Sequence, residues 1–170
     1  MFAILRRAGV VFIAVAAIVS SGAPSYAASA AASAQQATVK SLTGNWTCVT
    51  HTSDGKTWHE SDANTMWGTW LKVDATYPAQ NGQPAGTGMT FFGYDAKHSR
   101  WIVTSVDTGG GYSSSYSNSP AWSGSKWHDG YPNNNGSGSV TASANQFVID
   151  GSGPNDQGKV VTSHEVCSKS

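Results

Sequence analysis

The histidines and carboxylates of this chain could act as general acids, bases or metal ligands, but their spacing forms no recognisable catalytic motif. His59 is followed by Glu60, and His128 by Asp129. Adjacent side chains of a strand point to opposite faces, so neither pair would form an acid–base dyad. Serines are numerous, yet no Gly-x-Ser-x-Gly elbow is present with triad partners at a recognisable spacing. An enzyme is therefore the third-ranked function for this sequence.

Two cysteines bracket almost the whole folded part of the chain. Cys48 lies in the first strand-like segment, and Cys167 lies three residues from the end. A bond between them would close a loop of about 119 residues and stabilise the fold by roughly 4–5 kcal/mol in the chain-entropy model. The alternative is two separate buried thiols. A metal–thiolate site would need further ligands at motif spacing, and the sequence has none.

The N-terminus has the organisation of a secretory leader. Arg6 and Arg7 precede an apolar run at 10–19 and a small-residue stretch at 20–34. This pattern predicts a helical signal peptide over residues 1–27, cut after Ala27, with Ala30 as a second candidate. The apolar run is too short for a transmembrane anchor, so no membrane insertion is expected once the leader is removed. The mature protein is expected to be exported, either periplasmic or secreted, where disulfides persist.

The charge balance argues against nucleic acid as a partner. The chain has 10 basic and 10 acidic residues, so removal of Arg6 and Arg7 leaves 8 against 10, a balance of −2. Nucleic acid and anionic membranes normally call for a basic patch, and no run of charge is present. Few charges, 19 glycines and 7 tryptophans are typical of exported β proteins with many turns.

The segment after the leader divides into a lead-in and one domain. Residues 28–40 are small and polar and are expected to be flexible, whereas residues 41–170 show period-two segments broken by Gly, Pro, Asn and Asp. Strands are predicted at 45–52, 57–61, 66–77, 86–95, 100–107, 112–117, 121–128, 137–141, 146–150 and 159–167. Residues 113–138 could instead form a long ordered loop. The prediction is an all-β fold, an antiparallel up-and-down β-barrel of about 8–10 strands.

A family resemblance rests on a succession of motifs. Leu-Thr-Gly-Asn-Trp at 42–46 resembles the Gly-x-Trp opening of the lipocalin and avidin superfamily. It is followed by Met-Trp-Gly-Thr-Trp-Leu at 66–71, Phe-Gly-Tyr-Asp at 92–95 and Arg-Trp-Ile-Val at 100–103. Together they are similar to a bacterial family of small exported lipocalin-like, calycin-type barrels of unknown function. The avidin likeness ends after the first strand and does not imply biotin.

The resemblance implies an orientation for the first and last strands. In such barrels Trp46 would plug one end, and the two strands would be antiparallel neighbours. If Cys48 lies opposite Cys167, then Thr50 lies opposite Glu165 on the same face as Trp46. Glu165 would then point inward as a partly buried carboxylate, a kind of group that clusters at functional sites. The alternative is a hydrated position at the open rim.

The same register places two histidines on the other face. His51 would lie opposite His164, pointing outward, where neutral imidazole nitrogens could bind a divalent metal. They are weak metal candidates, because a coincidental placement on the surface is the better explanation. Haem occurs in some related barrels through a histidine near the last strand, which His164 could supply only if it pointed inward. No cofactor is therefore predicted.

The aromatic residues favour a binding function. The protein is predicted to bind a small apolar or amphipathic molecule inside the barrel, with access at the end opposite Trp46. The main alternative is a surface module that contacts carbohydrate or protein through the aromatic segment from Tyr112 to Tyr131, and a third is an enzyme of unknown reaction. A barrel filled by its own side chains would have no cavity. The candidate ligand-lining residues are Trp67, Leu71, Phe91, Tyr94, Trp101 and Glu165.

Overall fold

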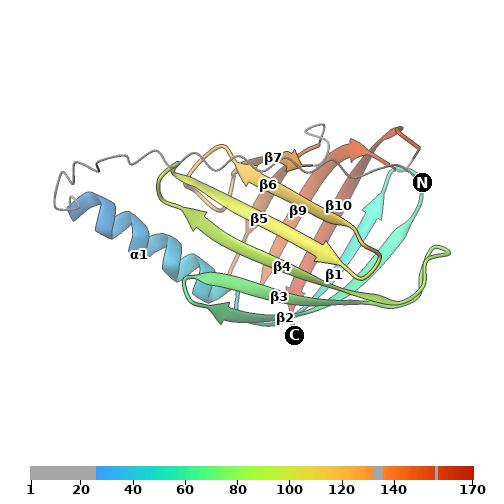
Figure 1. Ribbon diagram of the computed structural model, residues 1–170, viewed down its shortest axis with the longest axis horizontal. Helices are drawn as coiled ribbons and strands as arrows, with labels where there is room; N and C mark the ends of the chain where they lie inside the picture. The colour runs from blue at the N-terminus through green and yellow to red at the C-terminus, as the bar shows by residue number, and fades with distance from the viewer. Residues whose placement is uncertain (1–25, 132–135, 156) are drawn as a thin grey trace, which may run out of the picture.

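The computed structural model describes residues 26–131, 136–155 and 157–170 and shows a closed antiparallel barrel (Figure 1). The sheet order is β1-β10-β9-β8-β7-β6-β5-β4-β3-β2, so every strand pairs with its neighbour in sequence and β1 pairs with β10. This confirms the predicted all-β, up-and-down architecture. The elements are α1 (Tyr26–Ser41), β1 (Gly44–Thr52), β2 (Thr57–Trp67), β3 (Trp70–Tyr77), β4 (Gly86–Asp95), β5 (Arg100–Asp107), β6 (Tyr112–Ser117), β7 (Lys126–Tyr131), β8 (Ser137–Ala142), β9 (Gln146–Pro154) and β10 (Val160–Lys169).

The lead-in predicted at 28–40 lies within helix α1. Helix α1 is rich in alanine, the residue with the highest helix propensity. Its last turn carries Val39, and Leu42 follows the helix; both are buried at one end of the barrel. The signal peptide stays a prediction, because residues 1–25 lie outside the described part of the chain. No helix among the described residues has the length and apolar character to cross a membrane.

A tight hairpin divides the segment predicted as one strand over 66–77. Strand β2 ends at Trp67 and β3 begins at Trp70. Gly68, at the first turn position, has a φ of 63°, a conformation that two-residue hairpins with glycine there require. The turn separates Trp67 from Leu71, so the two do not share a face. Trp67 is 63% exposed, whereas Leu71 is 2% exposed.

The loop between β6 and β7 folds into the core. Ser117 accepts a hydrogen bond from the Trp101 backbone N–H at 2.9 Å, and the Trp101 indole donates to the Pro120 carbonyl at 3.0 Å. Trp122 packs edge-on against Trp127, with an interplanar angle of 87°. Because both tryptophans pack against the core, they do not form the exposed coplanar platform expected of a surface module.

The pairing of β1 with β10 follows the predicted register. Cys48 lies opposite Cys167, Thr50 opposite Glu165 and His51 opposite His164. The two cysteines form the predicted disulfide, with 2% and 0% of their surfaces exposed. The bond therefore joins the first and last strands inside the barrel.

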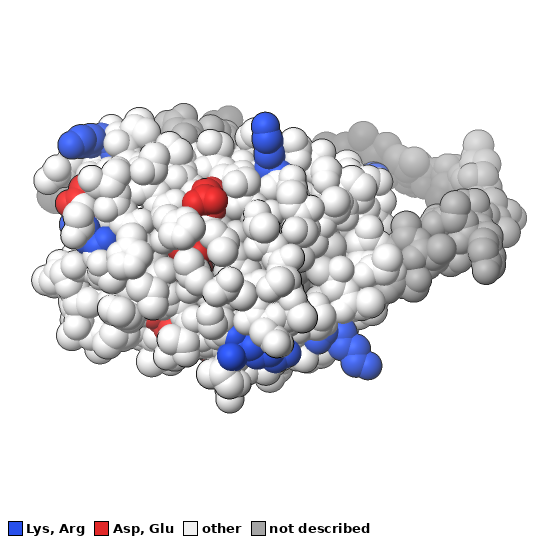
Figure 2. All heavy atoms as spheres, turned by 180° about the vertical axis from the view of Figure 1, so that it is seen from behind, with Lys and Arg blue, Asp and Glu red and all other residues white. Residues whose placement is uncertain are grey.

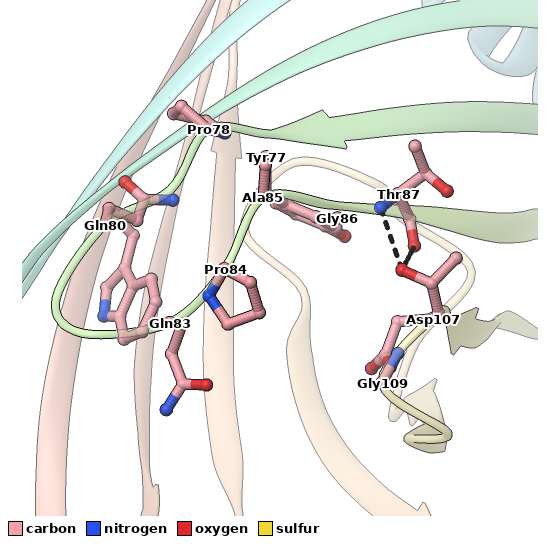
Figure 3. A pocket seen from close by; sticks show the side chains of 12 residues that line it. Tyr77, Pro78, Gln80, Gln83, Pro84, Ala85, Gly86, Thr87, Asp107 and Gly109 are labelled. Carbon is pink, nitrogen blue, oxygen red and sulfur yellow. Dashed lines mark hydrogen bonds between the residues drawn. The ribbon is translucent and has the colours of Figure 1, made fainter.

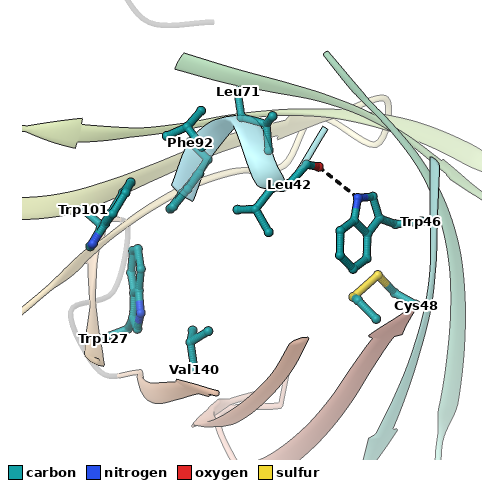
Figure 4. Packing of buried hydrophobic residues seen from close by; sticks show 10 residues of the cluster. Leu42, Trp46, Cys48, Leu71, Phe92, Trp101, Trp127 and Val140 are labelled. Atoms are coloured by element: carbon teal, nitrogen blue, oxygen red, sulfur yellow. Dashed lines mark hydrogen bonds between the residues drawn. A yellow bond between two sulfur atoms is a disulfide. The ribbon is translucent and has the colours of Figure 1, made fainter. Parts of the chain in front are cut away.

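The apolar core fills the end of the barrel that α1 covers (Figure 4). Trp46 is 1% exposed there, and its indole donates to the Leu42 carbonyl at 2.9 Å, so the chain segment after the helix and the first strand are fixed to each other. Phe92 stacks on Trp101 with ring centroids 4.9 Å apart. The other buried members of the cluster are Val39, Cys48, Leu71, Trp127, Val140 and Cys167.

Removal of the disulfide should weaken the fold without changing its topology. Because the bond closes a loop of 119 residues, the double variant Cys48→Ser/Cys167→Ser should lose about 4–5 kcal/mol of unfolding free energy, measured by urea denaturation. Reductant should lower the stability of the wild-type protein and leave the double variant unchanged. Equal stability of the two proteins under oxidising conditions would contradict this role.

Candidate functional site

The predicted ligand-lining residues divide between the core and the outer wall. Leu71 and Trp101 are 2% and 1% exposed and belong to the packed end, where Tyr94 lies edge-on to Trp101 with centroids 5.1 Å apart. Trp67 packs against Phe91 at 5.2 Å on the outer wall, so these two residues do not line the interior. The outward direction of Trp67 follows from the hairpin at 68–69.

A pocket of about 370 Å³ opens at the other end of the barrel, opposite Trp46 (Figure 3). Trp58 of β2 and Tyr77 of β3 supply aromatic surface, and Pro78 and Pro84 add apolar surface from the loop between β3 and β4. Asp107, at the end of β5, supplies the carboxylate of the lining. The volume falls within the range of small-molecule sites in proteins.

The walls of the pocket are held by side-chain to backbone hydrogen bonds. Gln80 donates to the His59 carbonyl at 2.9 Å and accepts from the His59 N–H at 2.7 Å, which folds the β3–β4 loop against β2. Thr108 accepts from the Thr87 N–H at 3.1 Å on the opposite side of the mouth. The Asp107 carboxylate accepts from the backbone N–H groups that follow it in the turn, at 2.7 and 3.0 Å.

Gly88 determines where the Tyr77 ring lies. A Cβ atom built on Gly88 would come within 2.7 Å of the Tyr77 hydroxyl oxygen. The absence of a side chain therefore allows the tyrosine to lie across the inner face of β4. Burial, the main cause, and the nearby carboxyl of Glu60 raise the pKa of Tyr77 to about 12, so the phenol stays protonated.

Three carboxyl groups lie inside the barrel, beyond Trp58. Glu60 and Asp62 follow Trp58 at every second position of β2, and Glu165 comes from β10. Glu60 hydrogen-bonds Asp62, and Glu165 hydrogen-bonds Thr50. All three thus come from β2 and β10, the two strands that flank β1.

Burial is the main cause of the raised pKa values of these carboxyls. It raises the pKa of Glu60 to about 9, with further contributions from its hydrogen bond to Asp62 and from the charges of Asp62 and Glu165. Burial likewise raises the pKa values of Asp62 and Glu165. Since carboxyls without a counter-charge resist ionisation in a low dielectric, Glu60 keeps its proton at neutral pH.

No described lysine or arginine forms an ion pair with the three interior carboxyls. Lys72 pairs with Asp74 at 2.8 Å and Arg100 with Asp95 at 3.7 Å, both away from the interior group. The Asp62 Oδ1 atom is buried and has no hydrogen-bond partner among the described residues. On the face drawn in Figure 2, charged side chains are separated by broad uncharged areas. The interior therefore holds three carboxyl groups that no described lysine or arginine pairs with.

The disulfide borders this group but offers no thiolate to a metal. The Glu165 Oε1 atom lies 3.1 Å from the Cys167 sulfur, and the Asp62 Oδ2 atom lies 3.7 Å from the Cys48 sulfur. Bonded sulfurs lack the charge by which cysteine binds metal ions. His51 and His164 are exposed on the outer wall, as the register predicts.

Sequence reasoning missed Trp58, Glu60 and Asp62, although a signal was present. They alternate along 58–62, the spacing that places side chains on one face of a strand. The predicted strand ended at residue 61, and β2 continues to Trp67. Recognition of the turn at 68–69 would have extended the predicted strand beyond residue 61. It would then have shown that Trp58, Glu60 and Asp62 lie on one face of that strand.

Comparisons with known proteins show the fold. No protein-family model and no curated protein matches this chain. Among solved structures, EF1p2_mFAP2b bound to DFHBI is similar with a TM-score of 0.50 and 11% identity, covering 80% of this chain and 99% of that one. A redesigned barrel, mFAP0 bound to DFHBI, gives 0.46 and 12% over 76% and 99%. A de novo designed fluorescence-activating barrel gives 0.47 and 9% over 77% and 96%.

The interior carboxyls should make the stability of the protein fall as the pH rises. Glu60 has a pKa of about 9 in the folded chain against 4.5 ordinarily, so the folded state holds the extra proton between these values. The free energy of unfolding should then fall by about 1.4 kcal/mol per pH unit for each such proton in that window. Glu60→Gln should reduce the slope, measured by denaturation from pH 4 to 9.

Asp74→Asn provides the control, because Asp74 pairs with Lys72 outside the interior group. Its stability profile should run parallel to that of the wild-type protein. Parallel profiles for Glu60→Gln and wild type would show that the Glu60 carboxyl does not carry the effect.

Proposed function

We propose that the protein is an exported binding protein for a small amphipathic molecule that carries a protonated amine. The pocket opposite Trp46 carries the proposal, because it combines aromatic and proline surface with Asp107 at the barrel mouth. Flat aromatic side chains suit the apolar part of such a ligand. Trp58 and Tyr77 could also lie against its cationic end.

The charge distribution supports a cation over an anion. Asp107 lies in the pocket, and no described lysine or arginine forms an ion pair with it. A cleft lined by one sign of charge concentrates ligands of the opposite sign. An anionic ligand would meet repulsion from Asp107 and would find no lysine or arginine among the described lining residues.

The barrel neighbours support the coarser part of this proposal. The similar solved barrel with a TM-score of 0.50 is bound to DFHBI, a small dye, and a closed barrel of this kind can therefore hold a small molecule. The leader-like N-terminus supports export, and a disulfide fits an oxidising compartment. The lipocalin-like resemblance of residues 42–107 also fits a ligand-binding barrel.

Binding should depend on the headgroup of the ligand and on Trp58. Naphthylmethylamine should bind more tightly than naphthylmethanol, and naphthoate should bind most weakly, measured by calorimetry at neutral pH. Trp58→Ala should weaken amine binding about 5- to 10-fold, as expected for the loss of one aromatic contact of roughly 1–1.5 kcal/mol.

Trp67→Ala is the matched control, because Trp67 is exposed on the outer wall. Its affinity for the amine should equal that of the wild-type protein. Failure of all three probes to bind would contradict the proposed pocket, and equal affinity for the amine and the carboxylate would contradict the cationic ligand.

A further inference from the structure

Three histidines lie together on the outer wall where β10, β1 and β2 adjoin. His164 and His51 are direct partners across the closing pair of strands. His51 also lies opposite Thr57, so His59, two residues further along β2, occupies the diagonal position on the same face. All three are exposed. Three of the five histidines of the chain therefore gather on one small area.

Two of the imidazole rings are oriented by hydrogen bonds through the same nitrogen. His164 Nδ1 lies 2.7 Å from Asp150 Oδ1, and Asp150 is the residue of β9 directly opposite His164. His51 Nδ1 lies 3.0 Å from the Thr57 hydroxyl. Within the described ranges neither ring uses Nε2 in a hydrogen bond. A carboxylate at Nδ1 fixes the ring tautomer that leaves the Nε2 lone pair available, as in many metal sites.

We propose that this face binds a divalent transition-metal ion through Nε2 of His51 and His164, with His59 as the third ligand. Cβ atoms of directly opposite residues lie about 4.5–5.5 Å apart. Zinc binds imidazole nitrogen at about 2.0–2.1 Å, so two ligands in a tetrahedral arrangement lie roughly 3.4 Å apart. Because His51 and His164 are direct partners, rotation of their side chains could bring the two Nε2 atoms to this separation. His59 would approach the ion from its diagonal position on β2, and water would complete the coordination.

The ligand type selects the metal. Imidazole nitrogen suits zinc, copper and nickel, whereas magnesium and calcium prefer oxygen ligands. Asp150 acts as the orienting residue, because its carboxylate already holds His164 Nδ1. The bound ion would join β10 to β1 outside the barrel, on the same pair of strands that the disulfide joins inside. The proposed site uses side chains on the outer wall, and it adjoins the pocket at His59, whose backbone is bonded to Gln80.

Zinc titration of the full disulfide-bonded chain without a polyhistidine tag tests the proposal. Calorimetry at pH 7.5 should show one ion per chain, and NMR should show shifts in the signals of His51, His59 and His164. His51→Gln, His59→Gln and His164→Gln should each lower the zinc affinity at least 10-fold. Asp150→Asn should lower it about 10- to 100-fold, the usual effect of removing an orienting partner.

The remaining histidines provide controls. His98 lies in the turn after β4, and His128 lies on β7, so His98→Gln and His128→Gln should keep wild-type zinc affinity. Each variant should also keep the circular dichroism spectrum and the urea midpoint of the wild-type protein in the absence of zinc. No zinc binding by the wild-type protein would overturn the proposal. Full affinity in any of the three ligand variants would overturn it as well.

Discussion

Closure of the barrel between β1 and β10 is the constraint on which the rest of the structure depends. The pairing of Cys48 with Cys167 determines which side chains of both strands point inward. A shift of one residue would move a strand's inward side chains to the opposite face. On β10 such a shift would place His164 inside and Glu165 in solvent. The disulfide therefore fixes the chemistry of both walls as well as stabilising the fold.

The interior has two halves of opposite character. Around Trp46, aromatic rings and the segment after α1 form a packed core, whereas the mouth carries glycines, hydroxyls and carboxyls. Burial of Glu60 and its neighbours costs free energy, because protonation or an external cation must compensate for the missing counter-charge. The packed half supplies stabilisation that offsets this cost. Packing and binding surface thus occupy different ends of the same strands.

The sequence predicted the features that follow from local pattern and failed where a feature depended on distant contacts. Alternation along β4 and β5 predicted both strands, and the cysteine positions led to the correct register. The helical lead-in was missed, because Val39 becomes part of a core only when the barrel end is present. The pocket was missed for the same reason: Trp58 and Asp107 are 49 positions apart in the sequence, and only the fold brings them to one mouth.

Gly88 has a consequence for how this barrel could change over evolutionary time. The Tyr77 ring occupies space that any side chain at position 88 would claim, so a mutation there would move the tyrosine. Because Tyr77 lines the pocket, such a mutation would also change the shape of the pocket. During evolution, the addition of a single methyl group at position 88 could therefore change which ligands the barrel binds.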